Sequence, residues 1–285
     1  MISKEQFQKE LDIIISNAIR EDVGDGDHSS LACIPASATG KAKLLVKDNG
    51  IIAGVDFAVQ VFRYVDPNLE IEVFMQDGSE VKYGDVVLHV SGSSQSILKA
   101  ERLVLNAMQR MSAIATKTKV FVDLLGGTKT KILDTRKTTP GIRALEKWAV
   151  KIAGGENHRF ALYDMIMLKD NHNDFAGGIS KAIAKTNAYL KENTLDLKII
   201  VEARNLREVE EILKNDGVYR ILLDNFNYED TRKAVEMING RCLTESSGGI
   251  NEKTVRHYAE CGVDFVSSGA LTHSIYNMDL SLKAF

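Results

Sequence analysis

The sequence is poor in several residue types and patterns that would narrow its class. Its three cysteines, in 285 residues, form no CxxC or metal-like spacing, so neither a disulfide framework nor a zinc site is expected. Its three prolines and lack of low-complexity tracts argue against a long linker. No apolar run approaches the roughly 18–20 residues that cross a bilayer, and the polar opening "MISKEQFQKE" is unlike a secretory signal. We therefore expect a cytoplasmic protein with no membrane partner.

An excess of positive charge is also missing. The formal net charge is −3 and the pI is about 6.1, which gives no general attraction to nucleic acid. What is present is an ordinary globular composition, 44% hydrophobic and 26% charged, in a chain long enough for two domains or one large barrel. Any basic binding site must therefore be local.

The first part of the chain predicts a mixed α and β arrangement. Ser3 and Gln6 are spaced as a capping box before an apolar stripe, which predicts a helix ending near "EDVGDGDHSS". That acidic stretch is interpreted as a capping turn, because it lacks the terminal glutamate of an EF-hand calcium loop. Two strands, "GKAKLLVKD" and "EVKYGDVVLHV", are expected on either side of a helix, "GVDFAVQVFRYV". Residues 93–125 predict two helical stretches.

From residue 131 the pattern changes to short apolar runs that alternate with amphipathic stretches. Six runs predict strands: "KILD", "MIMLK", "LKIIVE", "RILLD", "RCLTES" and "VDFVSSG". A seventh strand is expected near 155–162. The residues Glu202, Asp224, Ser246 and Ser268 follow one another at intervals of 22 residues, which suits a repeated strand–helix unit. Such units imply a parallel sheet.

Nearly every predicted strand ends in a chemically useful side chain, which favours a barrel over a doubly wound sheet. In an α/β barrel all carboxyl ends of the strands open onto one mouth, where active sites are built. In a doubly wound sheet those ends spread along an edge, and no GxGxxG follows an early strand here. We therefore expect a barrel whose strand-end residues converge.

Three groups of residues at these strand ends define the expected chemistry. Arginine forks bind carboxylates or phosphates in bidentate fashion, two carboxylates without neighbouring His or Cys suit Mg²⁺, and glycine turns before helices cradle phosphates. The cations are Arg136, Lys137, His158, Arg159 and Lys169, the acids are Glu202 and Asp224, and the turns are "SSGGI" (246–250) and "SSGAL" (267–271). Together they predict a phosphorylated substrate with Mg²⁺ beside a substrate that carries carboxylates.

The stretch "LDTRKTTPGIRALEKWAVKIAGGENHRFALYDMIMLKDNH" (133–172) resembles the signature region of the quinolinate phosphoribosyltransferases, also called nicotinate-nucleotide diphosphorylases (carboxylating). The resemblance spans the chain. It continues through "REDVGDGDHSS", "AERLVLNAMQRMSAIAT", "VEA", "LLDN", "ESSGGI" and "GVDFVSSGALTHS". Alanine replaces a frequent family glycine at Ala113, Ala153 and Ala161, whereas all the charged positions match.

The resemblance implies a type II phosphoribosyltransferase fold: an N-terminal α/β sandwich domain (1–113, with the tail 274–285 packing back on it) and an incomplete six- to seven-stranded α/β barrel (114–273). It also implies a homodimer whose active site is shared across subunits. The implied reaction joins quinolinate to phosphoribosyl pyrophosphate with Mg²⁺ and gives nicotinate mononucleotide, pyrophosphate and CO₂.

The residue roles carried over with the resemblance fall into four groups. Arg102, Arg136, His158 and Arg159 would hold quinolinate, with Arg102 reaching across the dimer. Lys137 and Lys169 would contact substrate and phosphates, and Glu202 and Asp224 would serve Mg²⁺ and the ribose. Ser246, Gly248, Gly249, Ser268 and Gly269 would cradle the 5′-phosphate. No role is assigned to His28, His172 or His273.

Three alternatives stay open from the sequence. The first is a paralogue of the same fold associated with molybdenum transport, against which the retained arginines argue. The second is a Schiff-base aldolase that uses Lys169, since a strand-end lysine in a barrel is typical of that chemistry. The third is a regulator that binds a phosphorylated metabolite without turnover.

Overall fold

The structure, a computed structural model, describes residues 2–285, which form two compact units. The sheet unit comprises Ile2–Lys119, Thr138–Gly154 and Leu271–Phe285, and the barrel unit comprises Val120–Lys137 and Gly155–Ala270. The domain boundaries expected from the sequence, 1–113 and 114–273, stay a prediction, and these compact units are divided differently. Within the described residues no helix combines the length and the apolar character needed to cross a membrane.

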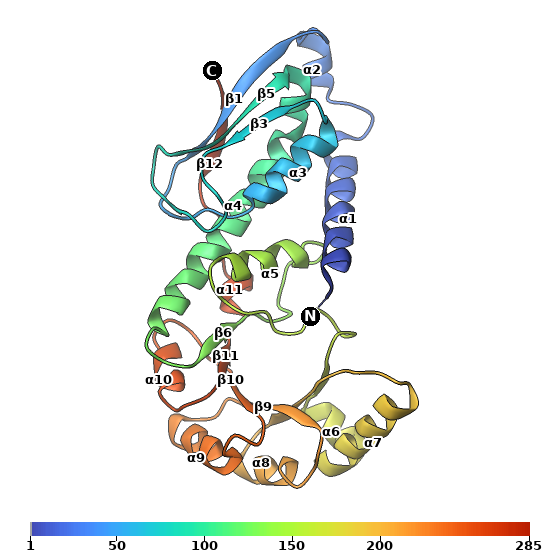
Figure 1. The fold of residues 1–285 in the computed structure, drawn as a ribbon, viewed down its shortest axis with the longest axis vertical. Coiled ribbons are helices and arrows are strands. Elements are labelled where there is room, and N and C mark those ends of the chain that lie inside the picture. The colour runs from blue at the N-terminus through green and yellow to red at the C-terminus, as the bar shows by residue number, and fades with distance from the viewer. Residues whose placement is uncertain (1) are drawn as a thin grey trace. The chain divides into compact units, whose positions relative to one another are not determined.

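The sheet unit is built on a four-stranded antiparallel sheet with the order β12-β1-β5-β3 (Figure 1). Its strands are β1 (Thr39–Val46), β3 (Glu70–Val73), β5 (Val86–Ser93) and β12 (Leu280–Ala284), and a separate pair joins β2 (Gly50–Ile51) to β4 (Glu80–Val81). Its helices are α1 (Lys4–Val23), α2 (His28–Cys33), α3 (Val55–Val65) and α5 (Arg143–Ile152), with most of α4 (Ser94–Leu124) and of α11 (Ala270–His273).

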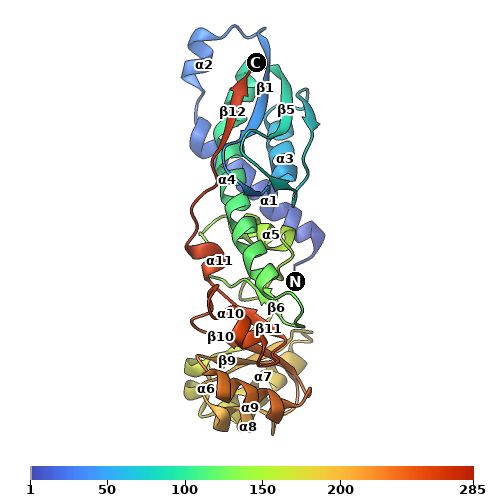
Figure 2. The ribbon, with the colours of Figure 1, turned by 90° about the vertical axis from the view of Figure 1, so that its left-hand side faces the viewer.

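One face of this sheet is apolar because the strands alternate. Leu44 pairs with Leu88, and both are fully buried, whereas the next pair, Lys43 with His89, lies on the opposite face. The helices α3 and α4 lie behind the sheet in Figure 2, and Phe57 of α3 and Met111 of α4 are fully buried. The sheet and these helices therefore share one apolar core.

The residues that the sequence indicates as caps at the start of α1 and before α2 are confirmed in that role. The Ser3 side chain accepts from the backbone N–H of Gln6 at 3.1 Å and caps α1. Asp27 accepts from the backbone N–H of Ser30 and caps α2, so the acidic stretch "EDVGDGDHSS" acts as a turn. The predicted strand at 40–48 and helix at 54–65 correspond to β1 and α3.

Two expectations for this region were wrong. The run "EVKYGDVVLHV" is two strands, β4 and β5, because Gly84 takes a left-handed φ of +95° and the Asp85 carboxylate accepts from the Lys82 N–H at 2.7 Å, which closes a turn. Residues 94–124 form one continuous helix, α4, instead of two. Within this helix the buried Ser112 hydroxyl accepts from the N–H of Ala53 and donates to its carbonyl.

The barrel unit repeats a strand–helix pattern along the chain. Its strands are β6 (Lys131–Leu133), β7 (Ile166–Leu168), β8 (Ile199–Ala203), β9 (Val218–Asp224), β10 (Leu243–Ser247) and β11 (Phe265–Ser267). Its helices are α6 (Asp170–Ala176), α7 (Ile179–Glu192), α8 (Leu206–Ile212), α9 (Tyr228–Ile238) and α10 (Val255–Ala259). All six strands predicted from apolar runs are confirmed.

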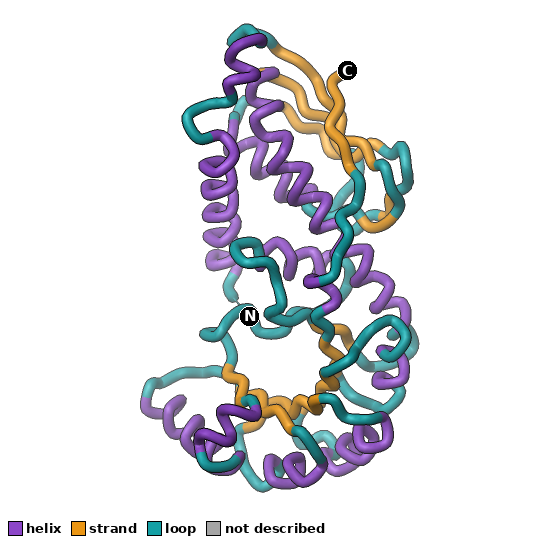
Figure 3. The backbone as a smooth tube through the Cα atoms, turned by 180° about the vertical axis from the view of Figure 1, so that it is seen from behind, coloured by secondary structure: helices purple, strands orange, loops and turns teal. Residues whose placement is uncertain are grey.

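The six strands are parallel and follow the order β6-β11-β10-β9-β8-β7. They curve into an arc with the helices on its outer side (Figure 3). At the free edge of β6, Glu156 forms an isolated parallel bridge with Leu133, at the place where a seventh strand was expected. The expectation of an incomplete six- to seven-stranded barrel is confirmed.

The two faces of this curved sheet differ in chemistry. Paired residues in a parallel sheet share a face, and so do residues two apart on one strand. Leu223 of β9 pairs with Ser246 and Ala203, on the face covered by helices. Leu222 pairs with Glu202 and Glu245, on the inner face. The inner face therefore carries the ionisable residues.

Candidate functional site

Three charged residues meet where β7, β8 and β9 end. Lys169 directly follows β7, Glu202 is the penultimate residue of β8, and Asp224 is the last residue of β9. The Lys169 Nζ lies 3.9 Å from the Glu202 Oε2. Asp224 shares the inner face with Leu222, the partner of Glu202 in the sheet. The predicted convergence of these strand-end residues is therefore seen.

The Glu202 carboxylate is held in a surrounding that disfavours its charge. The residue is 9% exposed, and this burial raises the pKa of its carboxyl, an effect to which Asp224 and Asp170 add. The ammonium of Lys169 acts in the opposite direction without cancelling them. A carboxylate in this position gains from a further cation, because a cation would offset both the burial and the repulsion from Asp224.

Asn225 fixes the loop that follows β9. Its backbone has a left-handed φ of +55°, its N–H donates to the Ser247 carbonyl at 2.8 Å, and its side-chain amide donates to the Asp224 carboxylate at 2.9 Å. Gly248, in the neighbouring loop, has a φ of +94°, and a Cβ there would collide with the Asn225 side chain. Asn225 therefore ties the acid at the end of β9 to the glycine turn after β10.

The two glycine turns follow neighbouring strands, as predicted. Gly248 and Gly249 follow β10, both with positive φ, and the space above Gly249 is open. Ser268 and Gly269 follow β11, and the buried Ser268 hydroxyl donates to the Ile250 carbonyl at 2.8 Å. That bond joins the second turn to the last residue of the first. Backbone N–H groups of such turns are suited to hold a phosphate.

The serines of these turns have unequal positions. Ser246 is 1% exposed and lies on the face of the sheet covered by helices, and its Oγ has no hydrogen-bond partner within residues 2–285. Ser247, one residue later, lies on the inner face and pairs with Asp224. The inner position next to the acid therefore belongs to Ser247, whereas the sequence reasoning chose Ser246.

The predicted cations Arg136, Lys137 and Arg159 lie on loops between β6 and β7. Arg136 and Lys137 are exposed, and Arg159 is only 8% exposed. The Arg159 guanidinium donates to the Met165 carbonyl at 3.2 Å. Burial lowers the pKa of Arg159, and the positive charge of Arg136 lowers it further, which shows that the two guanidinium groups are close enough to interact. A bound anion would relieve this repulsion.

His158 lies deeper than the arginines, in a buried charged cluster. Its Nε2 is 3.5 Å from the Glu245 Oε2, and the same oxygen accepts from the Arg220 Nη1 at 2.6 Å. Glu245 is fully buried and Arg220 is 5% exposed. Burial by itself raises the pKa of Glu245, but His158 and Arg220 outweigh it and lower the pKa to about 2. Glu245 is therefore an anion at neutral pH.

Arg102, the remaining predicted cation, belongs to the sheet unit. It lies on α4, its side chain is 66% exposed, and its guanidinium is 3.9 Å from Glu101. An exposed pair at this distance contributes little to stability. The side chain is therefore available for another contact.

Several residues of the site escaped the sequence reasoning. Arg220 and Glu245 lie inside apolar strands, and a charge within such a run is the signal that could have found them. Asp134, which the sequence places at a strand end without giving it a role, is fully buried and accepts from the His158 N–H at 2.9 Å. His172, left unassigned from the sequence, accepts from the Lys169 N–H at 3.1 Å and fixes the start of α6.

A resident metal would have few protein ligands here. No group of three or more His, Cys, Asp and Glu side chains suited to a metal ion occurs in the part of the chain that the structure describes. Glu202 and Asp224 supply two carboxylates, and Mg²⁺ is commonly held by one or two carboxylates together with substrate phosphates and water. The two acids fit that mode of binding and do not form a closed cage.

An incomplete parallel barrel with cations, two acids and paired glycine turns at its strand ends defines a protein of the phosphoribosyltransferase class. Two family models cover almost the whole chain: "Quinolinate phosphoribosyl transferase, N-terminal domain" matches residues 27–112, and the C-terminal domain of the same description matches 114–283. The chain belongs to the quinolinate phosphoribosyl transferase family.

Relatives and solved structures agree with this assignment. A chloroplastic nicotinate-nucleotide pyrophosphorylase (carboxylating) of Oryza sativa subsp. japonica is 44% identical over 96% of this chain and 77% of its own length. A probable enzyme of that name from Synechocystis is 38% identical over 93% of this chain and 89% of its own length. The crystal structure of NadC from Streptococcus pyogenes superposes with a TM-score of 0.89 at 38% identity, covering 99% of this chain and 97% of that one.

Proposed function

We propose that this protein transfers the phosphoribosyl group of phosphoribosyl pyrophosphate to quinolinate and releases pyrophosphate and CO₂, giving nicotinate mononucleotide. The observation that carries the proposal is the family match across 27–283, together with relatives of 38–44% identity that are named nicotinate-nucleotide pyrophosphorylase (carboxylating). The reaction is a pentosyl transfer, and it belongs to the synthesis of pyridine nucleotides.

The cations on the loops after β6 suit a pyridine dicarboxylate. Arg136 and Arg159 are mutually repulsive when the site is empty of anions, so a ligand with two adjacent carboxylates is bound with a gain in electrostatic energy. Lys137, exposed on the same loop, extends this positive field. His158 was expected to hold the same ligand, and it is 8% exposed.

The acids and the glycine turns suit phosphoribosyl pyrophosphate. The backbone N–H groups of Gly248, Gly249 and Gly269 would take the 5′-phosphate, with Ser246 and Ser268 beside them, and Lys169 would contact the pyrophosphate. Glu202 and Asp224 would hold Mg²⁺ and the ribose hydroxyls. Bound Mg²⁺ would neutralise charge that develops on the departing pyrophosphate.

The reaction depends more on the correct placement of the two substrates than on activation of either one. As pyrophosphate leaves, positive charge develops on the ribose C1, and the carboxylate of Glu202 or Asp224 lowers the energy of that charge. The pyridine nitrogen attacks C1 once the two substrates are held in contact, which is catalysis by proximity. The ring nitrogen is then cationic and stabilises the electron pair that stays on C2 when the 2-carboxylate departs as CO₂, and a proton from solvent then takes the place of the carboxylate on C2.

The position of Lys169 also bears on the aldolase alternative. A Schiff-base lysine is activated by an apolar surrounding or by a neighbouring cation. Lys169 instead has a half-exposed side chain, 3.9 Å from a carboxylate oxygen of Glu202. This surrounding favours an ammonium that binds phosphate over a nucleophilic amine.

A homodimer with a shared site is part of the proposal. Arg102 is exposed and belongs to the sheet unit, and the family resemblance assigns it to the quinolinate site of the partner subunit. An Arg102→Ala protein mixed with an inactive Lys169→Ala protein would regenerate one intact site per dimer and recover part of the activity. No recovery after proven subunit exchange would contradict the shared site. Relatives named chloroplastic or mitochondrial occur in plants, and the cytoplasmic location stays an expectation.

The direct test is an assay of the purified protein with quinolinate, phosphoribosyl pyrophosphate and Mg²⁺. We expect equal amounts of CO₂ and nicotinate mononucleotide. Nicotinate serves as the control acceptor, because it lacks the 2-carboxylate and should react poorly. Release of pyrophosphate without CO₂, or equal rates with the two acceptors, would contradict the proposal, and trapping of a carbonyl substrate on Lys169 by borohydride would favour the aldolase.

A further inference from the structure

The strand β6 and the segment that begins at Glu156 are paired through their backbones as far as Asp134. The Glu156 N–H donates to the Ile132 carbonyl at 2.9 Å, and the Asp134 N–H donates to the Glu156 carbonyl at 3.2 Å. In regular parallel pairing the next bond would join the His158 N–H to the Asp134 carbonyl. The His158 N–H instead donates to the Asp134 side chain, at 2.9 Å. The side chain therefore replaces a backbone acceptor at the point where the pairing ends.

The Asp134 side chain lets the two chains separate while they stay joined. Its accepting oxygen is separated from the backbone by Cβ and Cγ, whereas a carbonyl oxygen lies on the backbone itself. Its other oxygen accepts from the side-chain amide of Asn157. Asp134 is fully buried. Both oxygens of a buried carboxyl group thus hold the segment that contains Asn157 and His158.

Each of the two joined chains continues into a loop that carries a guanidinium group. Arg136 lies two residues after Asp134, and Arg159 lies one residue after His158. Burial and then the charge of Arg136 lower the pKa of Arg159, so the two like charges are near enough to repel each other. Because this repulsion acts to push the loops apart, they need a link to stay together. The hydrogen bonds of Asp134 supply one.

We propose that Asp134 is a positioning residue that sets the separation between Arg136 and Arg159, so that their two loops take the two adjacent carboxylates of one pyridine ligand together. This role rests on the proposed function for the identity of the ligand. It makes Asp134 a determinant of the preference for a 2,3-dicarboxylate over a monocarboxylate, acting through the two loops. His158 keeps its expected place among the residues that hold quinolinate, because the group that Asp134 takes is its backbone N–H.

A purely local role, such as closing one turn, fits Asp164 better than it fits Asp134. The Asp164 carboxylate accepts from the N–H groups of Phe160 and Ala161, within four residues, at 2.8 Å each. It therefore gives the loop after Arg159 its shape. The oxygens of Asp134 instead accept from donors that are 23 and 24 residues away in the chain. They therefore fix where that loop lies relative to β6.

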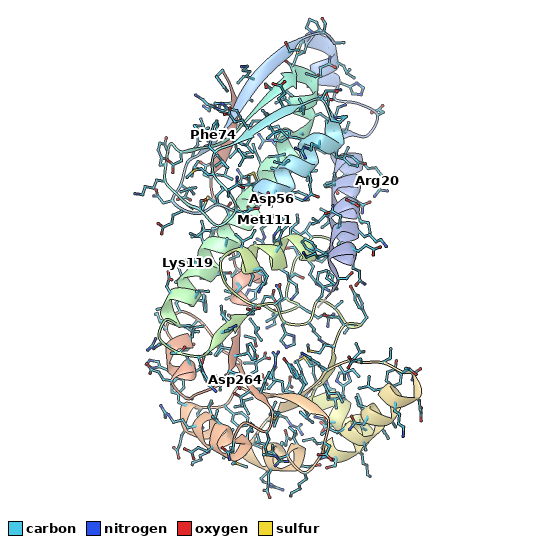
Figure 4. All side chains as sticks on the ribbon, in the orientation of Figure 1. Arg20, Asp56, Phe74, Met111, Lys119 and Asp264 are labelled. Atoms are coloured by element: carbon cyan, nitrogen blue, oxygen red, sulfur yellow. The ribbon has the colours of Figure 1, made fainter. Side chains whose placement is uncertain are left out.

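The first test needs no substrate and follows the His158 amide hydrogen by NMR in the full chain labelled with nitrogen-15 histidine. In Asp134→Ala this hydrogen loses its acceptor and should exchange with solvent about tenfold faster or more. The control is Asp264→Ala, which removes a carboxylate that accepts from Thr244 and Lys129 in the same unit, beside the amino ends of β10 and β11 (Figure 4). It should leave exchange at His158 unchanged. Equal exchange in the wild type and Asp134→Ala, or an equal increase in the control, would overturn the inference.

The second test compares calorimetric binding of quinolinate, nicotinate and phosphoribosyl pyrophosphate, each added alone. In Asp134→Ala the affinity for quinolinate should fall about tenfold, because one of its carboxylates loses an aligned cation. The affinities for nicotinate, which has one carboxylate, and for phosphoribosyl pyrophosphate, which the glycine turns would bind, should stay within about twofold. Equal losses for all three ligands, or an unchanged affinity for quinolinate, would contradict the role of Asp134. A wild type that binds no quinolinate would refute the proposed function instead, and hydrogen exchange at His158 would still decide whether Asp134 holds the loop.

Swapping the two side chains tests whether Asp134 and Asn157 act as a pair. Asn157→Asp sets a second carboxyl group against that of Asp134, and the affinity for quinolinate should fall about tenfold. The double variant Asp134→Asn with Asn157→Asp again sets one amide against one carboxyl group, and it leaves an oxygen on residue 134 for the His158 N–H. It should bind quinolinate within about threefold of the wild type. A folded double variant that binds no better than Asn157→Asp alone would show that the link is not what aligns the loops, and the inference would fall.

Discussion

Two glutamates on the inner face of the same curved sheet have opposite surroundings. Glu202 and Glu245 are both buried and both pair with Leu222 in the sheet. Burial and neighbouring acids raise the pKa of Glu202, whereas His158 and Arg220 overcome burial and hold the pKa of Glu245 at about 2. The difference shows that burial alone does not set the role of a carboxylate. Its neighbours make one glutamate responsive to a ligand and keep the other a fixed anion.

The largest expected effect comes from removing Arg220, the charged partner of Glu245. Arg220→Met removes the guanidinium from the buried Glu245 charge and leaves it with His158 and the Ser267 side chain, and the free energy of unfolding should fall by about 3–5 kcal/mol. Urea denaturation measures the loss. The double variant Arg220→Met with Glu245→Leu removes both charges and should recover most of the stability. A double variant no more stable than the single one would contradict this account.

Glu202→Gln tests the second glutamate, which lies at the carboxyl ends of the barrel strands. The change removes a negative charge from the place where the ribose cation develops, and kcat should fall by about 10²–10³-fold. The folded state should lose no stability, because the charge of Glu202 is disfavoured there. Steady-state kinetics and a thermal melt on the same sample check both parts. A variant that unfolds more easily yet keeps its kcat would contradict the contrast with Glu245.

Lowering the pH should change the stability contributed by the two glutamates in opposite directions. The pKa of Glu245 is lowered from 4.5 to about 2, so its contribution is present above pH 4.5 and is lost as the pH falls toward 2. The pKa of Glu202 is raised, so the folded state binds its proton more tightly, and stability contributed by Glu202 declines as the pH rises past 4.5.

Urea denaturation of the wild type and Glu202→Gln between pH 3 and pH 7 measures this difference. The stability gap should grow in favour of the variant as the pH rises through the region just above 4.5. A gap that is constant with pH would show that Glu202 titrates in its ordinary range.

The smallest expected effect concerns the loop next to Asp224. Gly248→Ala places a methyl group against the Asn225 side chain at a φ of +94° and should cost about 1–3 kcal/mol of unfolding free energy. Gly249→Ala is the matched control, since its φ is +62° and nothing lies within 4 Å of the added carbon, so it should cost about 1 kcal/mol or less. Equal costs would mean that Asn225 does not restrain the turn.

The sequence predicted the barrel well and its interior poorly, for physical reasons. Apolar runs locate buried strands, and a polar residue at each end marks the mouth, so Lys169, Glu202 and Asp224 could be placed together. A nearly continuous apolar strand does not show which of its faces is inner. Ser246 was chosen from the 22-residue spacing and the family resemblance, and its role stays a prediction, whereas Ser247 is the residue that pairs with Asp224 on the inner face.

The contact between Arg220 and Glu245 could not be predicted from the sequence, for a related reason. Arg220 and Glu245 are 25 residues apart, and only the register of β9 on β10 brings them into contact. Helix α4 was expected as two stretches, but its backbone is continuous from Ser94 to Leu124, and the Ser112 side chain inside it bonds to Ala53. The roles given to the site residues from the family resemblance remain to be tested by the experiments above.

The place of β12 in the chain has a consequence for how the protein is made. β1 lies between β5 and β12, so one of its two hydrogen-bonded edges is covered only by Leu280–Ala284 (Figures 1 and 2). During synthesis the ribosome completes every strand of the barrel before it delivers that segment. Until then β1 presents an open edge that can pair with another nascent chain. The sheet can therefore close only late in translation, and a premature stop before residue 280 would leave an aggregation-prone product even though every proposed site residue had been made.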